Sequence, residues 1–280
     1  MNLPPYFQVP AENLGRDCGV AVRIVADAAA LARRTAQDVL AAVEGARGAG
    51  RAPTLIVPVG PVDQYPVLVE LIRESHVSLA DVLVVAMDEY LDDEGRWVPL
   101  DHPPSFRAFL ERAFYGRIDP ARAPRPENRL VPNPESLSEI AQRIEERGGV
   151  DACFAGLGIN GHLAFHEPPR PGEGRSAEAF AGLGTRVSPL APETRAINAV
   201  TVGVGLKIVP KWAVTLGMRE IPASREIQIH ANRPWQRAVF RRALHGEIGP
   251  DCPASLIRRH PRVTLTLTDE VAQPPDVRLR

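Results

Sequence analysis

The sequence has little cysteine and almost no net charge, and each shortage excludes a class of protein. Its 280 residues include only Cys18, Cys153 and Cys252, an odd number at wide spacing. This argues against a disulfide framework and against paired zinc ligands, and it is typical of the reducing cytoplasm. The 33 basic and 34 acidic residues leave a formal charge of −1, which offers little attraction to nucleic acid or to an anionic membrane.

Long apolar runs are also missing. No segment approaches the roughly 18–20 apolar residues that span a bilayer, and the first residues, MNLPPYF, lack the basic start and apolar core of a signal peptide. We therefore expect a cytoplasmic protein that does not associate with membranes. With 44% hydrophobic and 24% charged residues, the composition is that of an ordinary folded domain.

No Gly/Ser-rich linker and no repeat divides the chain. We predict one domain over residues 1–280, with residues 1–15 as an N-terminal arm and 272–280 as a C-terminal tail. Apolar β-branched runs predict strands at 55–59, 82–87, 152–157, 200–204, 213–216, 227–230 and 263–268. Amphipathic patterns predict helices at 20–46, 65–74, 105–114, 136–147 and 234–244. Strands separated by helices indicate an α/β fold with a doubly wound, mostly parallel sheet.

Unusual residues follow the predicted strands, at the sheet edge where α/β proteins bind ligands. Residues 87–90 place Asp88 and Glu89 at such a strand end. A strand-end acid can be a catalytic group or a mere helix cap, and both readings of Asp88 stay open at this point. We expect Glu89 and the acids at 92–94 to be solvated.

A second candidate is the glycine-rich segment 156–168, GLGINGHLAFHEP. Its glycines let the backbone approach a ligand closely and offer N–H groups to an anion, but their spacing is not the dinucleotide fingerprint. His162 can exchange protons near neutral pH, and Glu167 could fix its tautomer and orientation. A metal site is disfavoured, because Glu167 is the one further ligand near His162 and His166.

Five motifs resemble, in order and spacing, those of the glucosamine-6-phosphate deaminase (isomerase) family, whose wider group includes 6-phosphogluconolactonase: residues 87–90, 102–106, 156–168, 193–195 and 209–213. The resemblance covers about residues 55–269, and its ending FHEP is closer to the deaminases. It implies a three-layer α/β/α, Rossmann-like fold. It also implies conversion of an amino-sugar phosphate into a ketose phosphate and ammonia without a cofactor.

The resemblance also implies roles for individual residues. His162 matches the base that opens the sugar ring, Glu167 matches its orienting acid, and Asp88 matches the carboxylate that carries a proton between carbons 2 and 1. Substrate contacts are expected from backbone at Gly60, Gly158 and Gly161. Arg195 matches the family's phosphate-binding arginine, and Arg237 or Arg233 lies near the place of its phosphate-binding lysine, although these two could equally form surface ion pairs. No metal is required, and a homo-oligomer is expected by analogy.

Two departures from the family pattern concern this site. Asn160 stands where the family has an aspartate, so the amide can orient His162 but adds no negative charge beside it. The segment 58–64, PVGPVDQ, lacks the hydroxyl groups of the family's phosphate loop, and Pro61 removes one N–H. A lactone hydrolase, in which His162 would activate water, and a non-catalytic sugar-phosphate sensor are the alternative readings.

Overall fold

The computed structural model describes residues 3–170 and 172–277. Residues 1–2 of the predicted arm and 278–280 of the predicted tail lie outside these ranges. The main sheet has seven strands, all parallel, in the order β1-β10-β9-β6-β2-β3-β5. Its members are β1 (Val20–Val25), β2 (Thr54–Val57), β3 (Leu83–Ala86), β5 (Arg129–Leu130), β6 (Ala152–Ala155), β9 (Ile227–Ala231) and β10 (Val263–Thr268).

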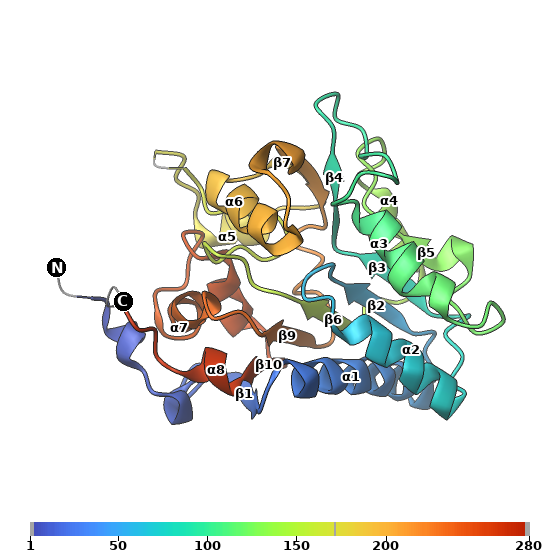
Figure 1. The fold of residues 1–280 in the computed structure, drawn as a ribbon, viewed down its shortest axis with the longest axis horizontal. Helices are drawn as coiled ribbons and strands as arrows, with labels where there is room; N and C mark the ends of the chain where they lie inside the picture. Colours follow the sequence, from blue (N-terminus) through green and yellow to red (C-terminus); the bar gives the residue numbers. More distant parts are fainter. Residues whose placement is uncertain (1–2, 171, 278–280) are drawn as a thin grey trace.

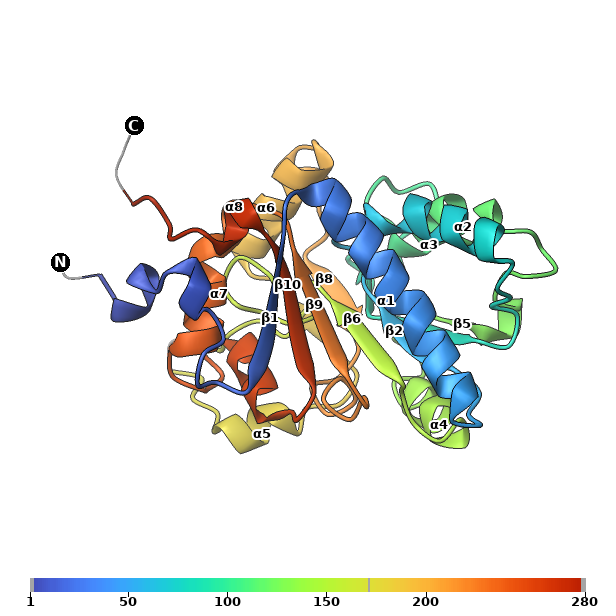
Figure 2. The same ribbon diagram turned by 90° about the horizontal axis from the view of Figure 1, so that it is seen from below.

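Helices cover both faces of this sheet, because side chains along each strand alternate between two apolar cores. Ile56 of β2 belongs to one core, whereas Leu55 belongs to the other. Figure 2 shows the longest helix crossing one face of the central strands. That face carries α1 (Ala28–Gly48), α2 (Gln64–Ser75) and α3 (Phe106–Ala113), and the opposite core takes residues from α4 (Glu139–Glu146), α5 (Ala177–Ala181), α7 (Gln236–His245), the 3-10 helix η6 (Pro253–Arg259) and α8 (Asp269–Ala272). The predicted three-layer α/β/α fold is confirmed.

A second, smaller sheet lies beyond the carboxyl edge of the main one (Figure 1). It is antiparallel, in the order β4-β8-β7, with β4 (Asp88–Leu91), β7 (Arg186–Pro189) and β8 (Trp212–Thr215). A third apolar cluster joins it to α6 (Pro192–Val202). Because β4 starts two residues after β3 ends, the chain passes directly from one sheet to the other at Met87–Asp88.

Three element predictions are wrong in part. The predicted helix 20–46 begins as a strand, β1, and α1 starts only after Asp27, whose side chain accepts a hydrogen bond from the Ala30 N–H at 2.8 Å. Residues 20–25 form a strand because they pair with β10, and the local pattern of apolar residues carries no information about so distant a partner. The predicted strand 200–204 covers the end of α6 and its cap, where Gly203 has a φ of 75°. The predicted strand 213–216 falls in the small sheet rather than the parallel one.

The strand order creates a crevice where the functional site lies. From β2 the chain continues to β3 on one side, while β6 lies on the other side of β2, so connections leave the carboxyl ends of β2 and β6 in opposite directions. Such a switch point is where open α/β sheets bind ligands. The loops after the two strands touch here: a Cβ at Gly156 would lie 2.4 Å from the Gly60 carbonyl oxygen. Only glycine permits this approach.

Candidate active site

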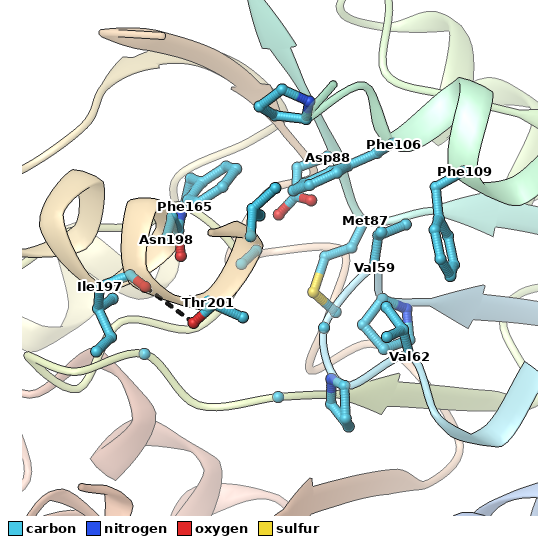
Figure 3. Close-up of a pocket in the computed structure, with 18 of the residues that line it drawn as sticks. Val59, Val62, Met87, Asp88, Phe106, Phe109, Phe165, Ile197, Asn198 and Thr201 are labelled. Carbon is cyan, nitrogen blue, oxygen red and sulfur yellow. Dashed lines mark hydrogen bonds between the residues drawn. The ribbon is translucent and has the colours of Figure 1, made fainter. Parts of the chain in front are cut away.

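A cavity of about 420 Å³ opens at this crevice, between the main sheet and the small one. Loops after β2, β3, β6 and β9 line it, together with α3 and α6. Figure 3 shows Val59, Met87 and Phe109 on one side of it and α6 residues such as Asn198 on the other. Among the candidate site residues named from the sequence, those that line the cavity are Gly60, Asp88, Gly158, His162 and Arg233.

Asp88 is the first residue of β4, and its side chain points into the cavity (Figure 3). The residue is only 7% exposed. Burial, with a further contribution from the charge of Glu89, holds the pKa of the Asp88 carboxyl well above its usual range. A carboxylate in this environment is a stronger base than one in water, which suits removal of a proton from carbon.

Glu89 is fully buried, so the expectation that it is solvated is wrong. Strand alternation turns its side chain away from Asp88 and toward the start of α3. There its carboxylate accepts hydrogen bonds from the backbone N–H groups of Phe106 and Arg107, at 3.0 and 2.8 Å, and from the Ser105 hydroxyl at 3.1 Å. The Arg107 guanidinium completes the set. Glu89 therefore fixes α3 against β4, and α3 forms one wall of the cavity.

The structure brings Asn160, His162 and Glu167 together. His162 Nδ1 lies 2.9 Å from Asn160 Oδ1 and 3.3 Å from Glu167 Oε2. The Asn160 amide nitrogen donates to Glu167 Oε2 at 2.7 Å and to Glu193 Oε1 at 3.1 Å. Thr194, which follows Glu193 on α6, lies 3.2 Å from His162 Nδ1 and donates to Glu167. No role was predicted for Glu193 or Thr194, although both lie in the motif at 193–195.

This network selects one tautomer of His162. Every partner of Nδ1 is an oxygen that can accept a proton, because the Asn160 amide nitrogen and the Thr194 hydroxyl are both used toward carboxylates. Nδ1 therefore carries the hydrogen and Nε2 keeps its lone pair. Since His162 lines the cavity, Nε2 is the nitrogen left to accept a proton from a ligand.

Glu167 is held ionised. Burial by itself would raise the pKa of this carboxyl, but the hydrogen bond and charge of His162, together with the amide of Asn160 and the backbone N–H of Ala191, lower it to about 2. The Ala191 bond, 3.1 Å long, ties Glu167 to the residue before α6. A fixed negative charge beside Nδ1–H stabilises the imidazolium that forms when Nε2 takes a proton.

Gly158 and Gly161, the two glycines of the 156–168 segment that were predicted to contact the substrate, have different roles. A Cβ on Gly158 would come within 2.0 Å of the His162 ring, so the absence of a side chain there makes room for the base. Gly161 does not line the cavity. Its φ of 89° and its packing against Cys252, 2.6 Å from an added Cβ, give it a role in the shape of the turn.

Of the three arginines named as substrate contacts, Arg195 and Arg237 do not line the cavity, whereas Arg233 does. The Arg195 guanidinium donates to the carbonyl oxygens of Leu206, Val209 and Pro210, at 3.0–3.3 Å, and holds the connection from α6 to β8. Arg237 pairs with Glu270 at 3.4 Å. The spacing of the motifs predicts that these residues lie near the site. It does not show which acceptors their guanidinium groups bind.

Besides Arg233, the cavity is lined by Arg112, for which no role was predicted. A sequence signal for Arg112 existed: Phe106, Phe109 and Arg112 recur at three-residue spacing, so they share one face of α3. Arg233 lies in the short loop between β9 and α7, near the place where the motif resemblance predicts a phosphate-binding basic residue.

Two buried histidines differ in their relation to the site. His166 Nε2 bonds the Leu216 carbonyl at 2.8 Å, and burial lowers its pKa to about 3. His230, at 1% exposure, lines the cavity floor, and its Nε2 has no hydrogen-bond partner. Across residues 3–170 and 172–277, no three His, Cys, Asp or Glu side chains gather closely enough to hold a metal ion. In the same ranges, no helix is long and apolar enough to cross a membrane.

Comparisons with known proteins agree on one family. Glucosamine-6-phosphate deaminase of Rhodopirellula baltica is 31% identical over 220 residues, which is 78% of this chain and 82% of that protein. The enzyme of the same name from Aliivibrio fischeri is 29% identical over 231 residues, covering 80% of this chain and 81% of its own length. No family model matches the sequence.

Solved structures show the same fold. A monomeric glucosamine-6-phosphate deaminase superimposes with a TM-score of 0.77 at 24% identity, over 90% of this chain and 99% of the other. The 6-phosphogluconolactonase of Trypanosoma cruzi superimposes with a TM-score of 0.65 at 17% identity, over 90% and 96%. At these identities the likeness concerns the fold alone.

Proposed function

Because the chain belongs to the glucosamine-6-phosphate deaminase family, we propose that Asp88 and His162 carry out the reaction of that family in this cavity. The protein is an enzyme that isomerises an amino-sugar phosphate and removes its amino group, giving a ketose phosphate and ammonia with the consumption of one water. The observation that carries the assignment of residues is the shared cavity: a buried carboxylate and a histidine with a free Nε2 line the same space.

We infer that His162 opens the sugar ring. Nε2 removes the proton of the anomeric hydroxyl and returns it to the ring oxygen, so that the carbon–oxygen bond of the ring breaks and an aldehyde forms. Glu167 stabilises the transient imidazolium, and Asn160 and Thr194 hold the ring in place. The net proton count of His162 is unchanged after ring opening.

Asp88 then shuttles one proton. Its carboxylate removes the hydrogen of carbon 2, and a proton passes from the substrate's ammonium group to the carbon 1 oxygen, which gives an enolamine. Asp88 then delivers the proton that it took from carbon 2 to carbon 1. The product is an imine at carbon 2. Addition of water and loss of ammonia give the ketose phosphate. The raised pKa of Asp88 favours the first half of this transfer, since the buried carboxylate takes up a proton readily.

A reducing, cytoplasmic environment is part of the proposal. Cys18, Cys153 and Cys252 are all free thiols in the structure, and all are buried. A chain that keeps its cysteines unpaired is suited to a compartment in which thiols stay reduced. The homo-oligomer expected from the sequence stays a prediction, and a solved relative is a monomeric deaminase.

The test is the variant Asp88→Asn assayed for ammonia release from glucosamine 6-phosphate. The amide keeps the shape of the carboxylate but cannot accept a proton from carbon, so we expect a loss of more than tenfold, over about 1.4 kcal/mol in the barrier. Ligand binding, measured by calorimetry, should be nearly unchanged.

Two outcomes would contradict this function. Retention of more than about a tenth of the activity by Asp88→Asn would exclude Asp88 as the proton carrier. Hydrolysis of 6-phosphogluconolactone by the natural protein, without release of ammonia from the amino sugar, would assign it to the lactonases instead.

A further inference from the structure

One side of the cavity is formed by apolar side chains from the loop after β2 and from α3. Val59, Pro61 and Val62 line the cavity from the loop, and Phe109 lines it from the helix. Val59, Val62 and Phe109 are partly buried and pack on the core that also contains residues of α1 and α2. Figure 3 shows these three side chains on one side of the cavity, across from α6. The four residues form the apolar wall of the cavity.

The chain that carries this wall offers few hydrogen-bond donors. Residues 58–66 include no serine, threonine, lysine or arginine, and three of the nine are prolines, which have no N–H. One of them, Pro66, is the third residue of α2, in the first turn of the helix, where free N–H groups can bind an anion. The Tyr65 N–H is already used by the Val62 carbonyl at 3.2 Å. The start of α2 is therefore a poor site for a phosphate.

The amide side chains around the apolar wall donate to other groups of the protein. Gln64 donates to the Pro61 carbonyl at 2.7 Å, and Gln236 donates to a backbone carbonyl at 3.0 Å. Asn232 donates to the carboxylate of Asp63 at 2.9 Å, and that carboxylate would repel an anion brought to the start of α2. A phosphate placed against the wall would lose its hydration and gain few hydrogen bonds in exchange, which is costly.

Two cationic side chains, Arg112 and Arg233, also line the cavity, and both are exposed to solvent. An ion pair that forms at an exposed position contributes little to binding, because water and salt screen it. These arginines are compatible with a phosphate that stays in solvent, but they do not make binding depend on one.

The apolar wall matches the carbon-6 end of an amino sugar when that end is uncharged. Asp88 and His162 act on carbons 1 and 2 in the proposed function, so carbon 6 is the end of the opened chain farthest from the chemistry. Asn198 and Thr201, on the α6 side of the cavity, are polar and suit the hydroxyl groups between the two ends. A methyl group at carbon 6 that contacts the apolar wall removes apolar surface from water on both partners.

We propose that the cavity also binds and deaminates amino sugars that carry no phosphate, with an uncharged carbon-6 end against the apolar wall. The inference rests on the proposed function for its chemistry and adds a substrate class to it. With 6-deoxyglucosamine, the reaction consumes one water and gives 6-deoxyfructose and ammonia. No oxidant or second substrate is needed, because the proton moved from carbon 2 to carbon 1 carries out the isomerisation.

The experiment compares kcat/KM for ammonia release from glucosamine 6-phosphate, glucosamine and 6-deoxyglucosamine with the natural protein. We expect the value for 6-deoxyglucosamine to lie within about tenfold of that for the 6-phosphate. Glucosamine should be a poorer substrate than the 6-deoxy sugar, because its carbon-6 hydroxyl would be buried without a partner. A loss of more than about tenfold on going from the 6-phosphate to the 6-deoxy sugar would overturn the inference.

The variant Val62→Thr tests the apolar wall directly, since threonine keeps the shape of valine and adds a hydroxyl donor. It should raise the ratio of kcat/KM for the 6-phosphate to that for the 6-deoxy sugar by about threefold or more. The matched control is Val67→Thr, because Val67 is partly buried against the same core but does not line the cavity. The control should leave the ratio unchanged. An unchanged ratio in Val62→Thr, or an equal change in both variants, would overturn the role of the wall.

Failure of this inference is distinguishable from failure of the proposed function. Turnover of the 6-phosphate alone keeps the function and overturns the inference. Release of no ammonia from any of the three sugars contradicts the function, and calorimetry on the Asp88→Asn variant then tests the wall by itself. In that variant, 6-deoxyglucosamine should bind with a dissociation constant within about tenfold of that of the 6-phosphate, and a larger difference would overturn the inference.

Discussion

The Asn160 side chain connects the catalytic histidine to two carboxylates. Its oxygen faces His162 Nδ1, and its amide nitrogen donates to two carboxylates, Glu167 and Glu193. An aspartate cannot replace it without change, because the position would then have three carboxylates in contact and no donor between them. The asparagine is thus matched to Glu193, which also approaches from α6.

The contacts of Asn160 predict how Asn160→Asp changes the pH–rate profile and the stability of the protein. The new carboxylate should favour the protonated form of His162, so the acidic limb of the pH–rate profile moves to higher pH. It should also destabilise the fold by roughly 1–3 kcal/mol, because Glu167 and Glu193 lose their shared donor. Chemical denaturation and the pH dependence of ammonia release measure the two effects.

The double variant Asn160→Asp, Glu193→Gln provides the control. The glutamine amide can donate to the new aspartate, so most of the lost stability should return while the shifted pH profile stays. If the double variant is as unstable as Asn160→Asp alone, repulsion from Glu193 is not the cause. Superimposable pH profiles for all three proteins would show that position 160 does not influence His162.

At the scale of elements, the loop from β6 to β7 carries the base but gains its shape from glycine. Gly158 donates its N–H to no side chain; instead its N–H bonds the His162 carbonyl at 3.1 Å, so the loop folds back on itself. The His162 ring then packs directly over the glycine, in space that any Cβ would occupy. The position of the imidazole relative to Asn160 therefore depends on a residue with no side chain of its own.

We predict that Gly158→Ala lowers kcat by 100-fold or more, since a displacement of about 1 Å can cost that factor when it misplaces a catalytic group. Stability should change far less than activity, because His162 can move into the cavity. Gly174→Ala is the matched control: it lies in the same long connection, and an added Cβ there meets nothing within 4 Å. Equal activity in the two variants would show that the glycine does not set the position of the base.

At the scale of the whole molecule, buried histidines make the fold sensitive to acid. Burial lowers the pKa of His166 to about 3 and that of His230 to about 4, both below the usual 6.5. Below pH 6.5 these two histidines therefore bind protons in the unfolded chain but not in the folded one. Unfolding is favoured progressively as the pH falls, and the loss is complete only below the folded pKa values.

This sign predicts that the two buried histidines lower the free energy of unfolding between pH 7 and pH 4. His230→Phe should make the decline shallower by up to roughly 1.4 kcal/mol per pH unit, the contribution of one proton. The phenyl ring can keep the stacking of His230 on Phe154, whose ring centroids are 6.1 Å apart. Urea denaturation across this pH range measures the slope, and an unchanged slope in the variant would contradict the buried neutral state of His230.

The sequence by itself determined the layered α/β fold and the neighbourhood of the site. Continuous apolar runs such as those of β2, β3 and β6 are local signals, because a strand buried on both faces needs apolar side chains at every position. Parallel strands end at a common edge, so polar residues after them must meet there. That reasoning, with the motif resemblance, placed Asp88, His162 and Glu167 in one region.

Only the tertiary structure decided which polar groups are free. Glu89 was expected to be solvated, but strand alternation turns its side chain into the start of α3, where it is buried. Arg195 belongs to a functional motif, yet its Nε and Nη2 groups donate to backbone carbonyls outside the cavity, whereas Arg112 and Arg233 line the cavity. The physical reason is common to all of these cases. The pairing of a strand, and the hydrogen bonds of a carboxylate or a guanidinium, depend on groups that are distant in the chain. Those groups come into contact only once the sheet has formed.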